Sequence, residues 1–138
     1  MEQRLSVVTL GVADISRARS FYEALGWVAS PASSADVAFF AGGGMVIALW
    51  DAAAQAADVG VEPAPPGAVG LAHNVREPAE VDAVLAEVQR AGGTVTRQAG
   101  PTFWGGYSGA FTDPDGHPWE VAHNPGWPLD DAGNVLLP

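Results

Sequence analysis

GAFTDPDGHPWEVAH, residues 109–123, is the stretch of sequence that decides the fold. Its centre, Asp113-Pro114-Asp115-Gly116, has the composition of a tight turn, because Pro presets φ, Gly accepts a positive φ and Asp side chains can bond nearby backbone amides. Apolar runs lie on both sides of this turn. The stretch therefore predicts a β-hairpin with strands over residues 109–112 and 117–124.

Glu120 lies in the second strand of this hairpin. Side chains alternate along a strand, so Glu120 shares one face with Ala122, while Trp119 and Val121 share the other. A carboxylate on one face and bulky apolar groups on the opposite face predict a strand that lies between a packed layer and a cleft.

The rest of the chain supplies further helices and strands. Pro78 suits the first turn of a helix that ends at Gly92. In the first half, Asp14 or Ser16 can cap a helix that ends before Gly26. Besides the two strands of the hairpin, the expected strands span residues 5–12, 27–30, 37–41, 45–50, 70–75 and 94–98.

Both halves read strand, helix, strand, strand, strand, which is the pattern of a duplicated unit. We expect a single domain over residues 1–138, and residues 52–57 can add one helical turn. The apolar tail is expected to pack across the body of the protein or across a partner subunit. The predicted parts are module one at about 5–50, a linker at 51–69, module two at about 70–124 and the packed tail at 125–138.

The composition excludes several classes of partner. Sixteen acidic and six basic residues give a formal net charge of -10, which opposes binding to nucleic acid and favours a cationic ligand. Alternatively, this acidity only keeps the protein soluble. With no cysteine, disulfides and thiolate metal sites are excluded. No apolar run approaches the ~18 residues of a membrane span, so we expect a cytoplasmic protein without a membrane partner.

Two motifs carry a resemblance to a known family. SFYEALGW at residues 20–27 and DPDGHPWE at residues 113–120 resemble the vicinal oxygen chelate superfamily, and the likeness extends over residues 5–125. This superfamily includes glyoxalase I, extradiol dioxygenases, fosfomycin-resistance enzymes and bleomycin-binding resistance proteins. The resemblance implies an α+β fold of two tandem β-α-β-β-β modules, whose curved mixed sheets enclose a cleft.

The resemblance also implies where a metal would be bound. Metal-dependent members place His, Glu or Gln at four strand positions, which correspond here to Val7, Ala48, Gly70 and Glu120. A divalent metal requires three or four donor groups, and one carboxylate cannot supply them. We therefore expect neither a metal nor another cofactor.

Glu120 is the candidate catalytic residue. In an apolar cleft it can act as an acid or base, or bind a cation or a hydrogen-bond donor. Alternatively, it pairs with a backbone amide or with an Arg in the sheet.

Aromatic side chains indicate a binding site for a small planar or cationic molecule, although they can equally fill the core or a dimer interface. The chain is therefore predicted to be a metal-free, antibiotic-sequestering type of protein that forms a homodimer by analogy with the family. The alternatives are a glyoxalase- or dioxygenase-type enzyme, metal-dependent or using Glu120, and a structural or regulatory dimer with a vestigial cleft. The predicted ligand-binding residues are Thr9, Trp50, Asn74, Phe103, Trp104, Tyr107 and Glu120.

Overall fold

The computed structural model describes residues 1–137. The chain divides into two compact units, Met1–Pro65 and Pro66–Pro138. Each unit contains one mixed β-sheet, so the predicted α+β class and the pair of mixed sheets are confirmed. The placement of the two sheets about a cleft stays a prediction. The elements are β1 (Val7–Val12), α1 (Ile15–Ala24), β2 (Val37–Ala41), β3 (Val46–Asp51) and α2 (Ala52–Val59), followed by β4 (Leu71–Val75), α3 (Pro78–Ala91), β5 (Thr94–Pro101), β6 (Tyr107–Thr112) and β7 (Pro118–His123).

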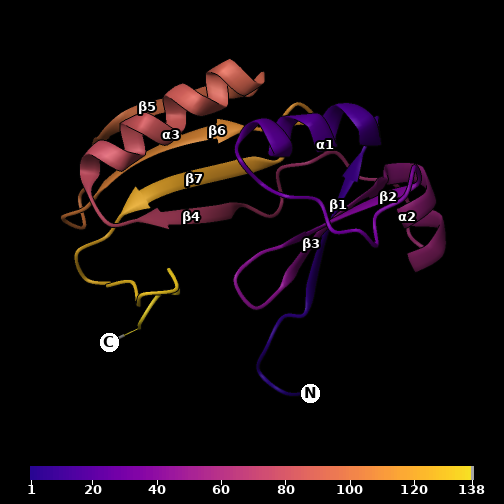
Figure 1. The fold of residues 1–138 in the computed structure, drawn as a ribbon, viewed down its shortest axis with the longest axis horizontal. Coiled ribbons are helices and arrows are strands. Elements are labelled where there is room, and N and C mark those ends of the chain that lie inside the picture. The colour runs from indigo at the N-terminus through magenta and orange to yellow at the C-terminus, as the bar shows by residue number, and fades with distance from the viewer. Residues whose placement is uncertain (138) are drawn as a thin grey trace. The chain divides into compact units, whose positions relative to one another are not determined.

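The first unit packs α1 against a three-stranded sheet in the order β1-β3-β2, in which β1 and β3 run parallel (Figure 1). Asp14 caps α1, because its side chain accepts a hydrogen bond from the amide of Arg17 at 2.9 Å. On the face toward the sheet, Tyr22 contacts Phe40, with ring centroids 5.9 Å apart. Both side chains are buried, so this pair lies in the core of the unit.

The predicted strand over residues 27–30 is wrong. Only Ala29 makes a bridge, to Phe40, and the sheet has three strands instead of four. The amide of Phe39 donates to the hydroxyl of Ser33 at 3.0 Å, so a side chain takes the hydrogen bond that a neighbouring strand would have used. The serine-rich loop therefore replaces the ladder at this edge.

The start of the predicted linker is a helix of two turns, α2, which is longer than the single turn expected. Asp51 begins it by accepting a hydrogen bond from the amide of Ala54 at 2.8 Å, and Gly60 ends it in the left-handed conformation. The helix packs closely on β1 at Gly11, where an added Cβ would lie 2.8 Å from Oε1 of Gln55. The side chain of Gln55 can move away, but the added Cβ would also lie 3.2 Å from Cα of Ala52, so the close approach of α2 favours glycine at this position.

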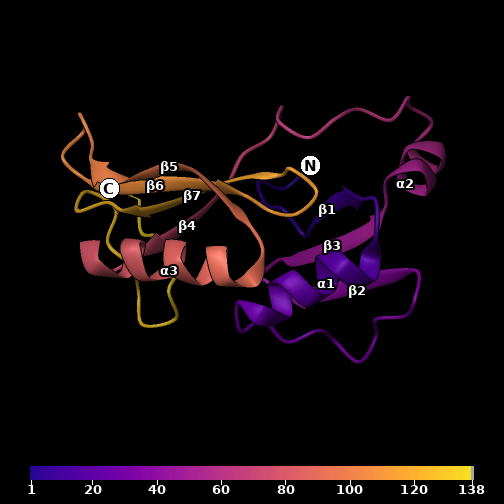
Figure 2. The same cartoon turned by 90° about the horizontal axis from the view of Figure 1, so that it is seen from above.

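The second unit has the strand order β4-β7-β6-β5, with α3 along one face of the sheet (Figure 2). Val81, Leu85 and Val88 on α3 are buried against this face. Helix and sheet lie close together at Gly109, where an added Cβ would be 2.5 Å from Cδ1 of Leu85. The core of the unit therefore lies between α3 and one face of the sheet.

The hairpin predicted with strands over residues 109–112 and 117–124 is present. β6 and β7 pair antiparallel, and the register places Glu120 opposite Ala110 and Val121 opposite Gly109. Val121 is fully buried beneath α3, while Glu120 points to the opposite face, as predicted from alternation. We call that opposite face of the second sheet the Glu120 face.

The strands predicted over residues 94–98 and 109–112 are both longer in the structure, because β5 and β6 join in a hairpin of their own. Its loop is closed by Thr102, whose amide donates to the carbonyl of Gly106 and whose hydroxyl accepts from the amide of Gly106, both at 2.9 Å. Residues 102–106 therefore form the turn of a second hairpin.

The tail after residue 124 contacts its own unit through Arg76. The guanidinium of Arg76 donates to the carbonyl of Leu129 at 3.1 Å and to the carbonyl of Asp130. Large apolar side chains nevertheless remain exposed in this segment, including Trp127 and Leu136.

No helix in the described part of the chain combines the length and apolarity needed to cross a bilayer.

Candidate functional site

One row of side chains crosses the Glu120 face. The register pairs Arg97 on β5 with Ala110 on β6, Ala110 with Glu120 on β7, and Glu120 with Ala72 on β4. Arg97 and Glu120 are thus two strand spacings apart, about 9.6 Å along the sheet. Because Ala110 between them is small, their long side chains can meet above it.

Arg97 makes three contacts on this face. Its Nη1 donates to the carbonyl of Ser108 at 2.8 Å, and its Nη2 donates to the hydroxyl of Ser108 at 2.9 Å. Nη2 also lies 3.4 Å from Oε1 of Glu120. Ser108 is buried, so its two hydrogen bonds fix the guanidinium of Arg97 to the sheet beside the carboxylate of Glu120.

An irregularity in β5 aims Arg97 at the face. The ladder between β5 and β6 shifts register on both sides of Arg97, between Val95 and Arg97 and again between Arg97 and Gly100. Such bulges twist a strand locally and redirect side chains. Counting alternate positions along β5 would therefore not show that Arg97 contacts Glu120.

The pair of Arg97 and Glu120 is half-exposed, with side-chain exposures of 50% and 44%. An ion pair this accessible contributes little to stability, about 0–1 kcal/mol. Its consequence is local charge balance. Although the chain carries a net charge of -10, Glu120 faces a guanidinium, which removes much of the electrostatic attraction of a simple cation to this position.

Three other predicted site residues lie on sheet faces away from the helices α1 and α3. Asn74 pairs with Ala122 in the register and so shares the Glu120 face. In the first unit, the register sets Thr9 beside Ala48, and alternation places Trp50 on the same face as Ala48, opposite the buried Leu49. The register therefore agrees with the predicted alternation of these three residues, while their contact with a ligand stays a prediction.

The three remaining aromatic residues are not brought to the Glu120 face as a group. Phe103 is fully exposed and Trp104 is 39% exposed, both in the loop between β5 and β6. Tyr107 points the opposite way, because its hydroxyl lies 3.3 Å from both carboxylate oxygens of Asp82 on α3. Partial desolvation and this carboxylate both raise the pKa of Tyr107.

The residues at the four metal positions of the family do not fit a metal. Val7 and Ala48 carry hydrocarbon side chains, and Gly70 carries none. Glu120 alone provides an oxygen donor, and it faces Arg97. Among residues 1–137, no group of three or more His, Asp or Glu side chains is placed to hold an ion.

Sequence reasoning missed Arg97 and Ser108. The notion that Glu120 pairs with an Arg in the sheet was one alternative, but no Arg could be chosen from the sequence. One signal was available, since Arg97 is the only arginine inside a strand among residues 1–137. Because the register shifts on each side of Arg97, counting alternate positions along the strand does not show which face of the sheet its side chain occupies.

The comparisons with known proteins agree with this architecture. The family model described as the Glyoxalase/Bleomycin resistance protein/Dioxygenase superfamily matches residues 4–121. A glyoxalase-related enzyme from Fulvimarina pelagi has a similar solved structure, with 38% identity, 99% of each chain covered and a TM-score of 0.93. The comparison with curated proteins gives no match.

More distant structures share the fold alone. The lactoylglutathione lyase from Agrobacterium tumefaciens is 20% identical, with 89% of this chain and 95% of that chain covered and a TM-score of 0.69. The fosfomycin resistance protein FosX from Mesorhizobium loti is 22% identical, with 90% and 94% covered and a TM-score of 0.67. The match over most of the sequence, together with the near-complete structural likeness, shows that the chain belongs to the glyoxalase, bleomycin resistance protein and dioxygenase superfamily.

Proposed function

We propose that this chain is a metal-independent protein that binds a small organic molecule at the Glu120 face, in the manner of an antibiotic-sequestering member of the superfamily. One observation carries the proposal. At the single metal position that retains a donor, Glu120 meets the guanidinium of Arg97 at 3.4 Å, while the other three positions lack any donor.

The chemistry of the face supports a planar polar ligand. Arg97 and Glu120 offer a donor and an acceptor side by side, both half-exposed. Beside Glu120 in the register, Ala72 is exposed and Ala110 is partly exposed, and both side chains are small, so a flat molecule can approach the sheet there. A ligand that carries both an acceptor and a donor matches this pair better than a simple cation does.

Ligand titration with and without a chelator tests the proposal. The probes are bleomycin, a planar cationic dye and a planar neutral flavone, and binding is followed by tryptophan fluorescence. We expect saturable binding of a planar probe that EDTA leaves unchanged. Arg97→Met should weaken it by roughly tenfold or more, because a charge-assisted hydrogen bond is lost.

A matched variant separates this effect from a general loss of positive charge. Arg90→Met removes an exposed guanidinium from α3, where it donates to the carbonyl of Ala86 in its own helix, and should leave affinity unchanged. Ala110→Met should block binding by filling the space over which Arg97 and Glu120 meet. Absence of binding across the panel, or binding that EDTA abolishes, contradicts the proposal.

A metal-free enzyme is the second candidate, favoured by the likeness to the glyoxalase-related enzyme from Fulvimarina pelagi. Here Glu120 is the acid or base. Under this alternative, turnover of a substrate such as lactoylglutathione should disappear in Glu120→Gln while the fold is retained. Binding without turnover in the wild-type protein favours the first candidate.

A cytoplasmic homodimer completes the proposal. The exposed apolar side chains of the tail, Trp127, Leu136 and Leu137, support a self-association surface, since such groups seldom remain in water together. Sedimentation of the intact chain measures its oligomeric state.

A further inference from the structure

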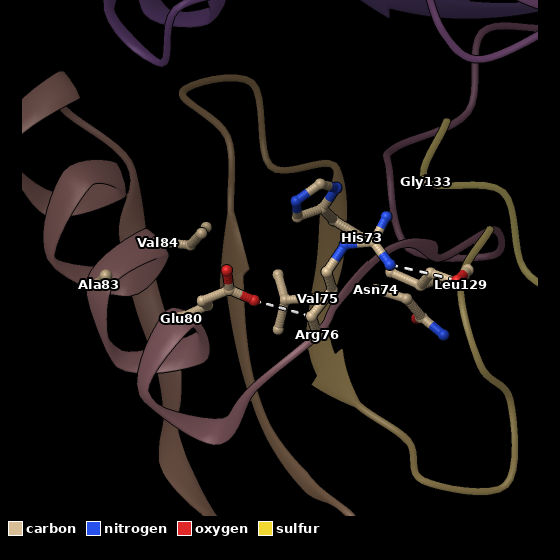
Figure 3. A pocket seen from close by; sticks show the side chains of 9 residues that line it. All are labelled: His73, Asn74, Val75, Arg76, Glu80, Ala83, Val84, Leu129 and Gly133. Carbon is tan, nitrogen blue, oxygen red and sulfur yellow. Dashed lines mark hydrogen bonds between the residues drawn. The ribbon is translucent and has the colours of Figure 1, made fainter. Parts of the chain in front are cut away.

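A second space suited to a ligand lies at the end of β4. It is an open hollow of about 360 Å³ between β4, the first half of α3 and the tail (Figure 3), and we call it the cavity. That volume is at the lower end of the range of about 300–1,000 Å³ found for small-molecule pockets. Its lining residues are His73, Asn74, Val75, Arg76, Glu80, Ala83, Val84, Leu129 and Gly133.

The charged groups at this cavity are already engaged within the protein. Oε2 of Glu80 accepts hydrogen bonds from the amides of Arg76 at 2.7 Å and of Glu77 at 3.0 Å. The guanidinium of Arg76 donates to the carbonyls of Leu129 and Asp130 in the tail. These hydrogen bonds of Arg76 hold the tail against the end of β4, and the tail thereby forms one wall of the cavity.

Two polar side chains of the lining, His73 and Asn74, remain for a ligand, and His73 is the one that extends toward α3 (Figure 3). The register places it opposite Val121, on the face that α3 covers, and Figure 3 shows its imidazole extending toward the space near Val84. His73 is still exposed at its surface, but partial desolvation lowers its pKa, and the carboxylate of Glu80 opposes this shift. At neutral pH the ring therefore offers one hydrogen-bond donor and one acceptor without a charge.

The remaining walls are apolar. Val75, Ala83, Val84 and Leu129 contribute hydrocarbon to the lining. Leu129 and Gly133 also lie beyond residues 4–121, the part of the chain that the family model matches. The cavity thus depends on the tail. Of its lining residues on β4, Asn74 belongs to the Glu120 face, while His73 and Val75 belong to the face that α3 covers.

We propose that this cavity binds a small neutral molecule with a mainly apolar body and one hydrogen-bonding group, which contacts His73. An anion is disfavoured by Glu80 and by the acidity of the whole chain. A cation is disfavoured because it would meet Arg76, while Glu80 already accepts two backbone hydrogen bonds.

Amide chemical shifts in a titration of the intact chain test this proposal. The probes are benzyl alcohol, benzoate and benzylammonium, which share a ring but differ in charge. Benzyl alcohol should shift the amides of Val75, Val84 and Gly133 with a dissociation constant on the order of a millimolar. Benzoate and benzylammonium should bind at least tenfold more weakly.

Variants locate the binding. Val84→Trp should abolish the shifts by filling the cavity. If Val84→Trp does not fold, Ala83→Phe fills the cavity from an exposed lining position and should have the same effect. His73→Phe should weaken binding by roughly threefold to tenfold, as expected for one lost hydrogen bond. The control, Val59→Trp, makes the same change at an exposed position on α2 and should preserve binding. Unmoved amides, equal binding of the charged probes, or binding retained in the filled variants overturns the proposal.

Discussion

Replacing Phe40 with Ala should lower the free energy of unfolding by about 3–5 kcal/mol. Phe40 is 1% exposed and lies against Tyr22 and Trp27, with ring centroids 5.9 and 5.7 Å away. Removing its ring leaves a cavity among aromatic side chains that are held by α1 and by the sheet, so little collapse can compensate. Chemical denaturation of the intact chain measures the change.

The adjacent residue provides the control for this prediction. Phe39 lies on the opposite face of β2 and is only partly buried, so Phe39→Ala should cost clearly less than Phe40→Ala. Equal losses from the two variants would contradict the assignment of strand faces in the first unit.

Asp113→Ala should lower the free energy of unfolding by about 2–4 kcal/mol. Asp113 is buried at the turn between β6 and β7, and its Oδ1 accepts from the amides of Asp115 at 3.0 Å and His117 at 2.9 Å. Alanine leaves both amides without this acceptor. The turn that sets the register of the Glu120 face is thereby weakened.

Two comparison variants identify the cause. Asp113→Asn keeps a side-chain oxygen that can accept both hydrogen bonds and should recover about half of the loss. Asp131→Ala removes an exposed carboxylate from the tail and should change stability by no more than about 0.5 kcal/mol. A loss in Asp113→Ala no larger than that of Asp131→Ala would show that the turn does not depend on this side chain.

Most of the fold could be predicted because local signals agree with one another. The turn at residues 113–116, the cap at Asp14 and the glycine after each long helix all mark boundaries that the structure retains. The exceptions arise where side-chain hydrogen bonds compete with the backbone ladder. Ser33 displaces the strand expected over residues 27–30, and Asp51 begins a helix inside the expected linker.

The candidate site was only partly predictable. Alternation along the strands correctly places Glu120 and Asn74 on one face, because a period of two leaves no other choice once Val121 is buried. Tyr107 is aromatic like the other predicted ligand-binding residues Trp50, Phe103 and Trp104. Its position in β6 nevertheless directs its side chain toward Asp82. The role of Arg97 was not predicted, because the direction of its side chain depends on a bulge that arises from the pairing of β5 with β6.

Metal content of the intact protein tests the central claim most directly. The chain is purified without chelators, and bound Zn, Ni, Fe and Mn are measured in the wild type and in Glu120→Gln. Because Glu120 faces Arg97 and the companion positions lack donors, we expect far less than a stoichiometric amount of metal in both proteins. A stoichiometric metal in the wild type that Glu120→Gln loses would contradict the account.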